Sequence, residues 1–278
     1  MELRDILRRI VETANQEDLY LLYMAYRMIR ENAGLAYDEL IRLRKDMALR
    51  HVPMRGPMPP LVKRCNALDI VKLPEPEFPR KVSVEDAIRT RRSIREYTKD
   101  YITLSELSTI LYLSVGITAW EPGAYGLRMF PLRAYPSAGA LQPVEVYVYA
   151  DRVTGLRKGI YHYNPVEHSL ELLKEGDYSR RLAEIALGQR HVRDGAVVLI
   201  LTIYWARTRW KYGDRGYRYA LLDAGFAGEN IYLACQALGL GTCAVGAFFD
   251  DELCELLEID CKDEIPVLMF PVGRPARP

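Results

Sequence analysis

The feature that most constrains the fold is an unbroken helical pattern in the C-terminal half of the chain. Apolar or small residues follow one another there at steps of three and four: Tyr217, Ala220, Ala224, Ala227, Ile231, Ala234 and Leu238. Gly239 can cap the end of this helix. Most residues of the pattern are alanine, and Gly225 and Gly228 lie beside them, so another backbone can approach closely. We therefore predict a long central helix against which the rest of the domain packs.

Several segments have the composition of β-strands. AVVLILTIY (196–204) is β-branched and apolar on both faces, which is typical of a central strand, and VEVYVYA (144–150) alternates at period two. GIYHY and SLELL flank Asn164-Pro165 and predict a hairpin. CAVGAF and IPVLMFPVG predict two further strands. Because these strands mix with long helices without strict alternation, the predicted fold class is α+β.

The chain divides into three regions. Residues 1–51 repeat apolar residues at helical spacing, and the charges between them are typical of a solvated helix face. Residues 52–80 are rich in proline, which excludes a helix or a central strand and predicts an extended linker. Residues 81–278 form the main domain, whose first helices begin at Ser83 and at a capping box of Thr103 and Glu106.

Composition excludes several classes of function. The chain has 38 Lys and Arg residues against 37 Asp and Glu residues, so the whole molecule does not attract nucleic acid. The N-terminus lacks the apolar core of a signal peptide, and the uncharged run from Leu19 to Tyr26 is too short to span a bilayer. The cysteines form no CxxC pair, and no histidine near Cys254 and Cys261 completes a metal set. We expect a cytoplasmic protein with reduced thiols, no metal and no membrane contact.

Four clusters of residues can carry chemistry, and the first is RRSIR (91–95), placed where the helix that begins at Ser83 ends. Three guanidinium groups and the Ser93 hydroxyl can hold a phosphate, because guanidinium forks match phosphate oxygens. The alternative is that these arginines only complement the negative end of the helix dipole.

The second cluster is YPSAGALQP (135–143), directly before the strand VEVYVYA. Small residues between prolines give a fixed loop with exposed amides and room for a flat ring against the backbone. Gln142 can both donate and accept hydrogen bonds, as the pyrimidine edge of a flavin requires. A tight connection into the strand explains the same residues equally well.

The other two clusters flank the long helix. In GLGTCAVGAF (239–248) the helix precedes the glycines, which excludes a Rossmann fingerprint and fits a helix cap followed by close backbone approach to a ligand. RTRWKYGDRGY (207–217) is interpreted as a charged loop, and a solvated surface is its simplest explanation. Within it Lys211 and Tyr212 offer two proton-transfer groups, and burial beside Trp210 or nearby arginines would lower the pKa of Lys211 toward neutrality.

In this order the clusters resemble the nitroreductase superfamily and, within it, the SagB-type dehydrogenases that form thiazoles and oxazoles in peptides. The resemblance covers residues 82–278 and rests on RRSIREY, YPSAGALQP, WKYGDRGYRYALLDAGFAGEN, ALGLGT and PVGRP. It implies a three-layer α+β fold, with a mixed central sheet and helices on both faces, and FMN held between the subunits of a homodimer. The N-terminal helical region is an addition to this core.

The resemblance also implies roles for individual residues. The motif that contacts the FMN phosphate and ribityl chain is matched by Arg91, Arg92, Ser93 and Arg95, of which Arg95 reaches the pyrimidine side of the ring. The loop that the partner subunit brings to the ring is matched by Pro136, Ser137, Ala138, Gly139 and Gln142. The remaining matches are Val245 and Gly246, whose backbone N–H groups address N5 and O4, and Arg274, in preference to Arg277, as a further phosphate contact. Lys211 and Tyr212 match the pair implicated in azoline oxidation, with Lys211 as base and Tyr212 as relay.

Three functions fit these residues. The first is an FMN-dependent dehydrogenase that removes a proton and a hydride from an azoline-like, peptide-derived substrate, working beside a cyclodehydratase-type partner. The second is an NAD(P)H-dependent nitro or quinone reductase with an open pocket. The third is a flavin-binding or scaffold protein without turnover. The intact Lys211-Tyr212 pair favours the first.

Overall fold

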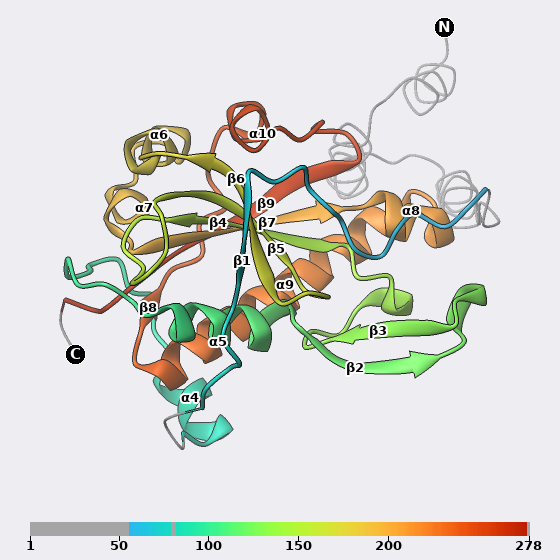
Figure 1. Cartoon of the computed structure of the whole chain (residues 1–278), viewed down its shortest axis with the longest axis horizontal. Coiled ribbons are helices and arrows are strands. Elements are labelled where there is room, and N and C mark those ends of the chain that lie inside the picture. The colour runs from blue at the N-terminus through green and yellow to red at the C-terminus, as the bar shows by residue number, and fades with distance from the viewer. Residues whose placement is uncertain (1–55, 79–81, 277–278) are drawn as a thin grey trace, which may run out of the picture.

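The computed structural model describes residues 56–78 and 82–276. The predicted helical region 1–51 and Arg277 lie outside the described residues. The described chain is built on one seven-stranded sheet in the order β1-β6-β5-β4-β7-β9-β8 (Figure 1). Its strands are β1 (Asp69–Lys72), β4 (Val144–Ala150), β5 (Gly159–Asn164), β6 (Ser169–Glu175), β7 (Val197–Tyr204), β8 (Gly241–Thr242) and β9 (Glu264–Gly273). Neighbouring strands of the sheet are antiparallel, whereas the predicted sheet was mixed; the parallel pairings Ser93–Thr242 and Ile102–Val153 are isolated bridges outside the named strands.

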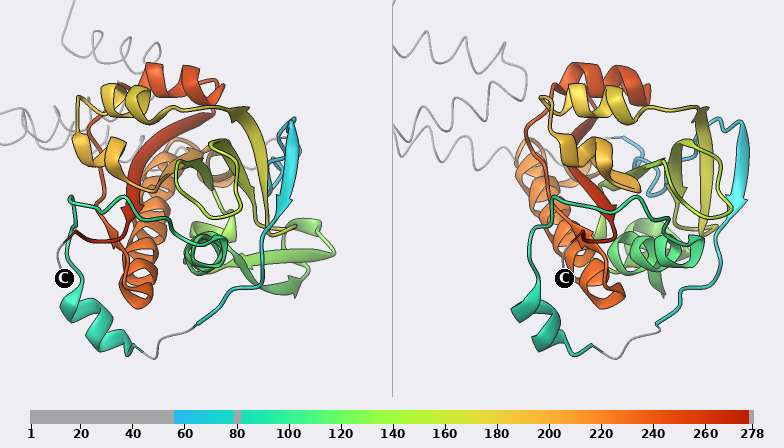
Figure 2. Two further views of the ribbon diagram at one scale, coloured as in Figure 1. Left: turned by 60° about the vertical axis from the view of Figure 1, so that its left-hand side comes forward. Right: turned by 90° about the vertical axis from the view of Figure 1, so that its left-hand side faces the viewer.

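Helices cover both faces of the sheet, so the domain has three layers (Figure 2). One face carries α5 (Leu104–Val115) and α9 (Arg215–Leu238), and the other carries α6 (Ser179–Ile185), α7 (Arg190–Asp194) and α10 (Asp250–Leu257). The central strands alternate between the two cores: Val146 and Leu199 are buried toward α5 and α9, whereas Tyr147 and Ile200 are buried on the opposite face. The predicted three-layer α+β fold is confirmed.

The remaining elements lie around the ends of the sheet. They are α4 (Val84–Thr90), the hairpin of β2 (Ile117–Pro122) and β3 (Met129–Arg133), α8 (Ala206–Tyr212), and single turns η1 (Ala124–Gly126) and η2 (Ala138–Ala140). The turn between β2 and β3 reaches α8, because the Tyr125 ring lies 5.5 Å from that of Trp210. These irregular pieces, rather than the sheet, surround the candidate site.

The long predicted helix is α9, and its small residues have the expected function in packing. A Cβ on Gly228 would lie 2.9 Å from the Phe270 ring of β9, so only glycine lets the sheet approach this closely. Gly239 ends the helix in the left-handed conformation, with φ of 70°. The capping box of Thr103 and Glu106, the hairpin β5–β6 and the central strand β7 are likewise confirmed.

Two predicted elements are wrong. Residues 206–212 form helix α8 and not a loop; the face of this helix that turns inward carries Arg207 and Thr208, so its periodicity is invisible to a hydrophobic pattern. CAVGAF is not a strand, since Val245 makes only an isolated bridge to Met269. The chain leaves the sheet after Thr242, and the backbone N–H of Ala244 donates to the hydroxyl of Tyr232 on α9 (2.7 Å) instead of to a strand.

The proline-rich segment contributes an edge strand. β1 pairs antiparallel with β6, and the flanking Leu61 and Leu73 are buried. A proline-rich stretch can supply an edge strand because only one side of such a strand has to form ladder hydrogen bonds. This part of the predicted linker therefore packs onto the sheet of the main domain.

The expectation that all thiols are reduced is also corrected. Cys254 and Cys261 form a disulfide, with Cα atoms 5.8 Å apart. Helix α10 ends at Leu257, and Glu258 follows in the left-handed conformation (φ 57°), which turns the chain back toward Cys254. The free cysteines of the described chain are Cys65, Cys235 and Cys243.

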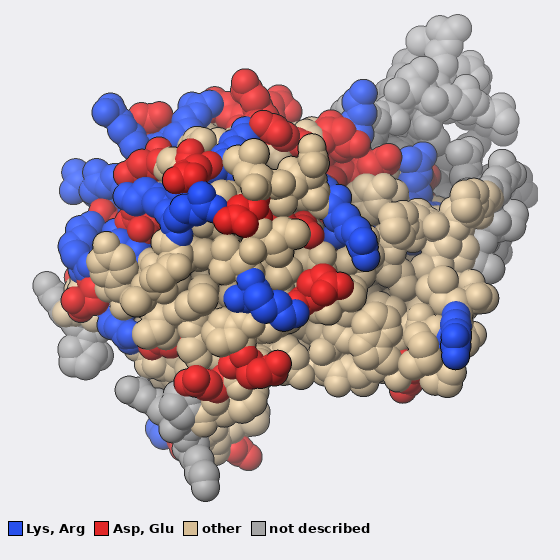
Figure 3. All heavy atoms as spheres, viewed as in Figure 1, with Lys and Arg blue, Asp and Glu red and all other residues tan. Residues whose placement is uncertain are grey.

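The sequence predicted neither a nucleic-acid partner nor a membrane partner. Two properties of the structure concern these predictions: the distribution of surface charge and the apolar character of the helices. On the face seen in Figure 3, basic and acidic side chains intermingle over α6, α7 and α10, whereas the region around the β2–β3 hairpin is mostly uncharged. Among the described helices, none combines the length and the apolar character needed to cross a membrane.

Candidate active site

The arginine cluster lies beside the glycine-rich segment that follows α9. The backbone N–H of Ile94 donates to the Thr242 carbonyl (2.9 Å), and a Cβ on Gly241 would lie 2.8 Å from Ile94. The hydroxyls of Ser93 and Tyr232 are 3.1 Å apart, and the Arg91 guanidinium lies 4.9 Å from the centroid of the Tyr232 ring. Residues far apart in sequence thus meet around Tyr232. Together with the other residues predicted for the phosphate and the ring edge, we call them the phosphate set: Arg91, Arg92, Ser93, Arg95, Tyr232, Thr242, Val245 and Gly246.

The other arginines of the first prediction differ in their surroundings. Arg92 is exposed and donates to the carbonyls of Arg89 and Arg91, at the end of α4. Arg95 is exposed. The pKa of His191 on α7 is lowered, first by burial of His191 and then by the nearby charge of Arg95. The Arg274 guanidinium makes two 3.0 Å contacts with the carboxylate of Glu106. Of the predicted phosphate contacts, Arg274 is therefore the one already engaged by an acidic partner.

The glycine-rich segment offers fewer free backbone donors than its sequence suggests. The N–H of Val245 donates to the Met269 carbonyl (2.8 Å), which commits that group to the isolated bridge with β9. A Cβ added to Gly246 would meet only the Leu268 side chain, at 3.8 Å, so the surface there is open. Of the two residues predicted to offer a backbone N–H to a flavin ring, Val245 is already engaged, which leaves Gly246 as the candidate.

The second cluster forms a rigid loop held by an acidic residue of α9. Asp223 accepts hydrogen bonds from the Ser137 hydroxyl (2.7 Å) and from the Ala138 N–H (3.2 Å), and the Ser137 oxygen accepts from the Gln142 N–H (2.9 Å). Burial raises the pKa of Asp223 to about 6, although the hydrogen bonds from Ser137 and Ala138 lower it. Sequence reasoning missed Asp223, because a single acid on a predicted helix carries no local sign of its partners.

Three proton-bearing groups converge on Gly139 of this loop. Lys211 Nζ donates to Tyr125 Oη (2.6 Å), which in turn donates to the Gly139 carbonyl (2.8 Å). A Cβ on Gly139 would lie 2.7 Å from Tyr212 Oη and 3.0 Å from both Lys211 Nζ and Tyr125 Oη. The predicted pair of Lys211 and Tyr212 is therefore brought together with the predicted ring-binding loop, and we call Lys211, Tyr212, Tyr125 and Gly139 the proton-transfer set.

The electrostatics of Lys211 differ from the expectation. The hydrogen bond with Tyr125 raises the pKa of Lys211, burial lowers it only partly, and nearby Tyr212 raises it further. The prediction that the pKa of Lys211 is lowered toward neutrality is thus wrong. Tyr125 itself was missed, since it lies 86 residues from Lys211 and is marked in sequence only by the glycines around it.

Helix α8 is fixed beneath this set by a buried arginine. Arg207 donates from Nη1 to the Gln142 carbonyl (2.6 Å) and from Nε to the Pro60 carbonyl (2.7 Å), and it pairs with the buried Glu145. One guanidinium therefore ties α8, the ring-binding loop and the proline-rich segment together. Because such a fork has fixed donor directions, it also fixes how α8 presents Lys211.

The residues around the loop 136–142 fit a flavin ring. Gln142 is buried, its Nε2 donates weakly to the Pro131 carbonyl (3.4 Å), and its Oε1 has no hydrogen-bond partner in the described chain. An unpaired buried amide oxygen is costly and suits the N–H of a ring edge. A hollow of about 220 Å³ opens beside the loop and is lined by Pro136, Ser137, Ala138, Tyr219, Leu222, Asp223 and Phe226.

The phosphate set and the loop that carries Gly139 contact α9 at different positions along the helix. They attach to α9 through Tyr232 and Asp223, which are separated by about 13 Å along a helix that rises 1.5 Å per residue. The structure thus brings the predicted residues into two groups, each assembled from distant parts of the sequence. A ligand that uses both groups has to span that distance or combine two chains.

Comparisons with known proteins show the family and the fold of the chain. The model of the Nitroreductase family matches residues 88–274. MJ1384, a candidate nitroreductase of Methanocaldococcus jannaschii, is 40% identical over 204 residues, which are 73% of this chain and 96% of that protein. The microcin B17-processing protein McbC of Escherichia coli is 28% identical over 153 residues, 49% of this chain and 52% of McbC. A chain in the structure of the E. coli microcin synthetase McbBCD complex, with truncated pro-MccB17 bound, shares the fold (TM-score 0.56, 18% identity, 96% of each chain covered).

Proposed function

Because the chain belongs to the nitroreductase family and is an oxidoreductase, we propose that it is an FMN-dependent dehydrogenase acting on azoline-like, peptide-derived substrates. The observation that carries the proposal is the convergence of Lys211, Tyr212 and Tyr125 on Gly139. A simple electron-transfer site has no need of proton-transfer groups at the ring, whereas aromatising an azoline requires the loss of a carbon-bound proton.

The phosphate set would hold the FMN phosphate, and the loop 136–142 would hold the ring. Arg91, Arg92 and Ser93 offer charged and hydroxyl donors at the end of α4. Gln142 Oε1 and the N–H of Gly246 are suited to the polar edges of the ring, and Arg95 would stabilise negative charge on the pyrimidine side. FMN, when bound, supplies the acceptor for the hydride.

The proton-transfer set would remove the substrate proton. Lys211 Nζ, held by Tyr125 against the Gly139 carbonyl, would take the proton from the ring carbon of the azoline in its neutral form. Tyr212 Oη, adjacent to the same glycine, would orient the substrate or relay the proton. Since the pKa of Lys211 is raised, the neutral amine is a minor species at neutral pH, and proton removal should become faster as the pH rises.

We further propose a homodimer in which each FMN contacts the phosphate set of one chain and the loop 136–142 of the other. The separation of the two sets along α9 supports this arrangement. So does the apolar rim of the hollow beside the loop, where Leu222 and Phe226 of α9 are 52% and 48% exposed. Half-exposed leucine and phenylalanine on a central helix are suited to contact with a second copy.

The peptide substrate and a cyclodehydratase-type partner are proposed from the likeness to McbC, whose fold is represented in the McbBCD complex. Dehydrogenation of an azoline has to follow the formation of that ring, so a second activity must supply the substrate.

The test is a pair of measurements on the purified holoprotein. The flavin released on denaturation should be FMN, and a thiazoline-containing peptide should reduce the bound flavin in a single turnover. Released FAD, or a protein that does not take up FMN, would refute the cofactor. Rapid oxidation of NAD(P)H without reaction of the azoline would identify a nitro or quinone reductase, and stable flavin without reduction by either donor would identify a binding protein.

A further inference from the structure

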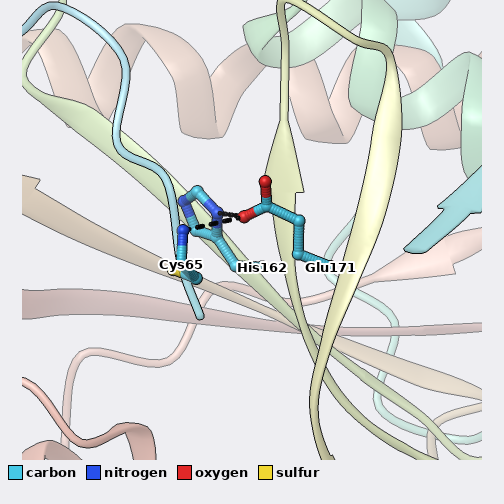
Figure 4. Close-up of side chains that lie close together, drawn as sticks. All are labelled: Cys65, His162 and Glu171. Carbon is cyan, nitrogen blue, oxygen red and sulfur yellow. Dashed lines mark hydrogen bonds and ion pairs between the residues drawn. The ribbon is translucent and has the colours of Figure 1, made fainter. Parts of the chain in front are cut away.

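Three metal-binding side chains meet outside the proposed active site, where the segment before β1 crosses β5 and β6 (Figure 4). His162 and Glu171 face each other in the register of these two strands, and both are buried. Cys65 comes from the proline-rich segment, and its backbone N–H donates to Glu171 Oε2 (3.2 Å). One ligand atom from each residue lies within 4.8 Å of the other two.

The donor set is that of a borderline transition-metal ion. A thiolate, an imidazole and a carboxylate are together typical ligands of Zn²⁺, whereas Mg²⁺ and Ca²⁺ prefer oxygen donors alone. Neighbouring ligand atoms in a tetrahedral zinc site are about 3.6 Å apart. His162 Nδ1 and Glu171 Oε2 are 2.9 Å apart, whereas the ligand atoms of all three residues lie within 4.8 Å of one another. Binding an ion therefore requires a movement of about 1 Å, mainly by Cys65, which is the most exposed of the three residues.

Both buried ligands are oriented by a further hydrogen bond. His162 Nε2 lies 3.1 Å from Glu145 Oε2, which leaves Nδ1 directed at Cys65 and Glu171. Glu171 Oε1 accepts from Asn164 Nδ2 (2.9 Å), which leaves Oε2 directed at the same point. A carboxylate on the far nitrogen of a ligating histidine is the usual arrangement in metal sites, because it fixes the tautomer and the ring orientation.

We infer that Cys65, His162 and Glu171 bind one Zn²⁺ ion, with water as the fourth ligand, and that this ion fastens residues 60–65 to β5 and β6. The same segment accepts a hydrogen bond at the Pro60 carbonyl from Arg207, the residue that positions α8 and the loop 136–142. The ion is thus a structural clamp behind the proposed active site. The sequence pattern predicted no metal because Cys65 and Glu171 are 106 residues apart, too far for ligand spacing to reveal them.

The test measures metal content in the untagged, full-length holoprotein. After chelation, incubation with Zn²⁺ and gel filtration, the wild type should retain about one zinc ion per chain, and its unfolding temperature should rise with added Zn²⁺. Cys65→Ala should retain none and show no such rise. Cys235→Ala, which removes a free cysteine buried in α9, should behave as wild type.

A spectroscopic measurement on the wild type does not depend on whether Cys65→Ala folds. The difference spectrum between Co²⁺-loaded and Zn²⁺-loaded wild type cancels the flavin bands and should contain thiolate-to-cobalt charge-transfer absorption. Failure of the wild type to retain zinc, equal retention by Cys65→Ala, or a cobalt difference spectrum without the thiolate band would each overturn the inference.

Discussion

At the scale of single residues, the contacts around Lys211 change its pKa in the direction opposite to the one expected. Lys211 was expected to become a base because burial would lower its pKa, yet the hydrogen bond with Tyr125 raises that pKa. Tyr125 thus sets both the position and the proton affinity of the amine. The consequence can be measured in the pH dependence of the reaction.

Lys211→Ala should leave flavin binding intact and lower single-turnover flavin reduction by about two to four powers of ten, the usual effect of losing a general base. The wild-type rate should rise with pH as the amine loses its proton. Tyr125→Phe removes the main cause of the raised pKa and should move that rise to lower pH. Tyr101→Phe, on an exposed tyrosine, is the control and should match wild type. An unchanged pH profile in Tyr125→Phe would contradict the assignment.

Asp223 gives a prediction about stability. Its pKa is about 6 in the folded protein, against about 3.9 for an ordinary aspartate, so between these values the folded chain holds a proton that the unfolded chain has released. The contribution of Asp223 to the free energy of unfolding is therefore greatest below about pH 4 and falls as the pH rises to about 6. Relative to Asp223→Asn, the wild type should lose stability across this window in chemical denaturation. The exposed Asp214→Asn should keep the wild-type slope, and an equal slope in Asp223→Asn would refute the prediction.

The chemical types at the site could be predicted from sequence, but their partners could not. Lys211, Tyr212 and Gly139 belong to local motifs, and the structure brings them together. Tyr125 acts on Lys211 and Asp223 acts on Ser137, each across 86 positions of the chain, and a pattern of local spacing contains no such information. For the same reason, the sequence did not predict that Cys65 lies beside Glu171.

At the scale of elements, the loop 136–142 is built for close approach. Gly139, Ala140 and Gln142 all have positive φ, with Gly139 at 61°, and the loop fits between α9 and the proton-transfer set. Its shape therefore depends on the absence of a side chain at Gly139 as well as on hydrogen bonds. Substitution of Gly139 and of Gly155, which both have positive φ, separates the effect of a steric clash from that of backbone strain.

Gly139→Ala should lower both flavin content and turnover, because its Cβ would lie 2.7 Å from Tyr212 Oη in addition to the strain of a left-handed alanine, which costs about 1 kcal/mol. Gly155→Ala carries the same backbone strain at φ of 78° but meets no atom within 4 Å. The second variant should be destabilised similarly and keep full activity. Equal activity in the two variants would show that the close approach at Gly139 has no functional role.

Elements with apolar periodicity were predicted well, and those with polar contacts were not. Helix α9 and strand β7 bury continuous apolar faces, which a sequence pattern detects. Helix α8 was missed because its buried face is held by Arg207 through hydrogen bonds and an ion pair. Strand β1 was missed because prolines around it hide a short edge strand, and CAVGAF was assigned to the sheet because Tyr232 takes the place of a strand partner.

At the scale of the whole molecule, the three-layer fold and the match over residues 88–274 confirm the identification with the nitroreductase superfamily, and the likeness to McbC supports the SagB-type assignment within it. The homodimer is a proposal that rests on the two residue sets in contact with α9 and on the apolar residues beside the loop 136–142, and it can be tested on the surface of that helix.

Phe226→Lys should weaken the dimer and release flavin together, because it places a charge on the apolar rim beside the loop 136–142. Phe249→Lys changes an equally exposed phenylalanine at the start of α10, on the opposite layer, and should keep both the dimer and the flavin. Light scattering with simultaneous flavin absorbance measures both properties. A monomeric wild type with full flavin, or a Phe226→Lys variant that stays dimeric and yellow, would contradict the proposal.

The edge strand β1 has a practical consequence for dissecting the chain. The family match begins at residue 88, which invites a fragment that starts near residue 82. Such a fragment would lack β1, so the seven-residue β6, whose first four residues are buried, would become the open border of the sheet. An uncovered strand of this length is a template for pairing between molecules, and we expect that fragment to aggregate where the longer chain stays dispersed.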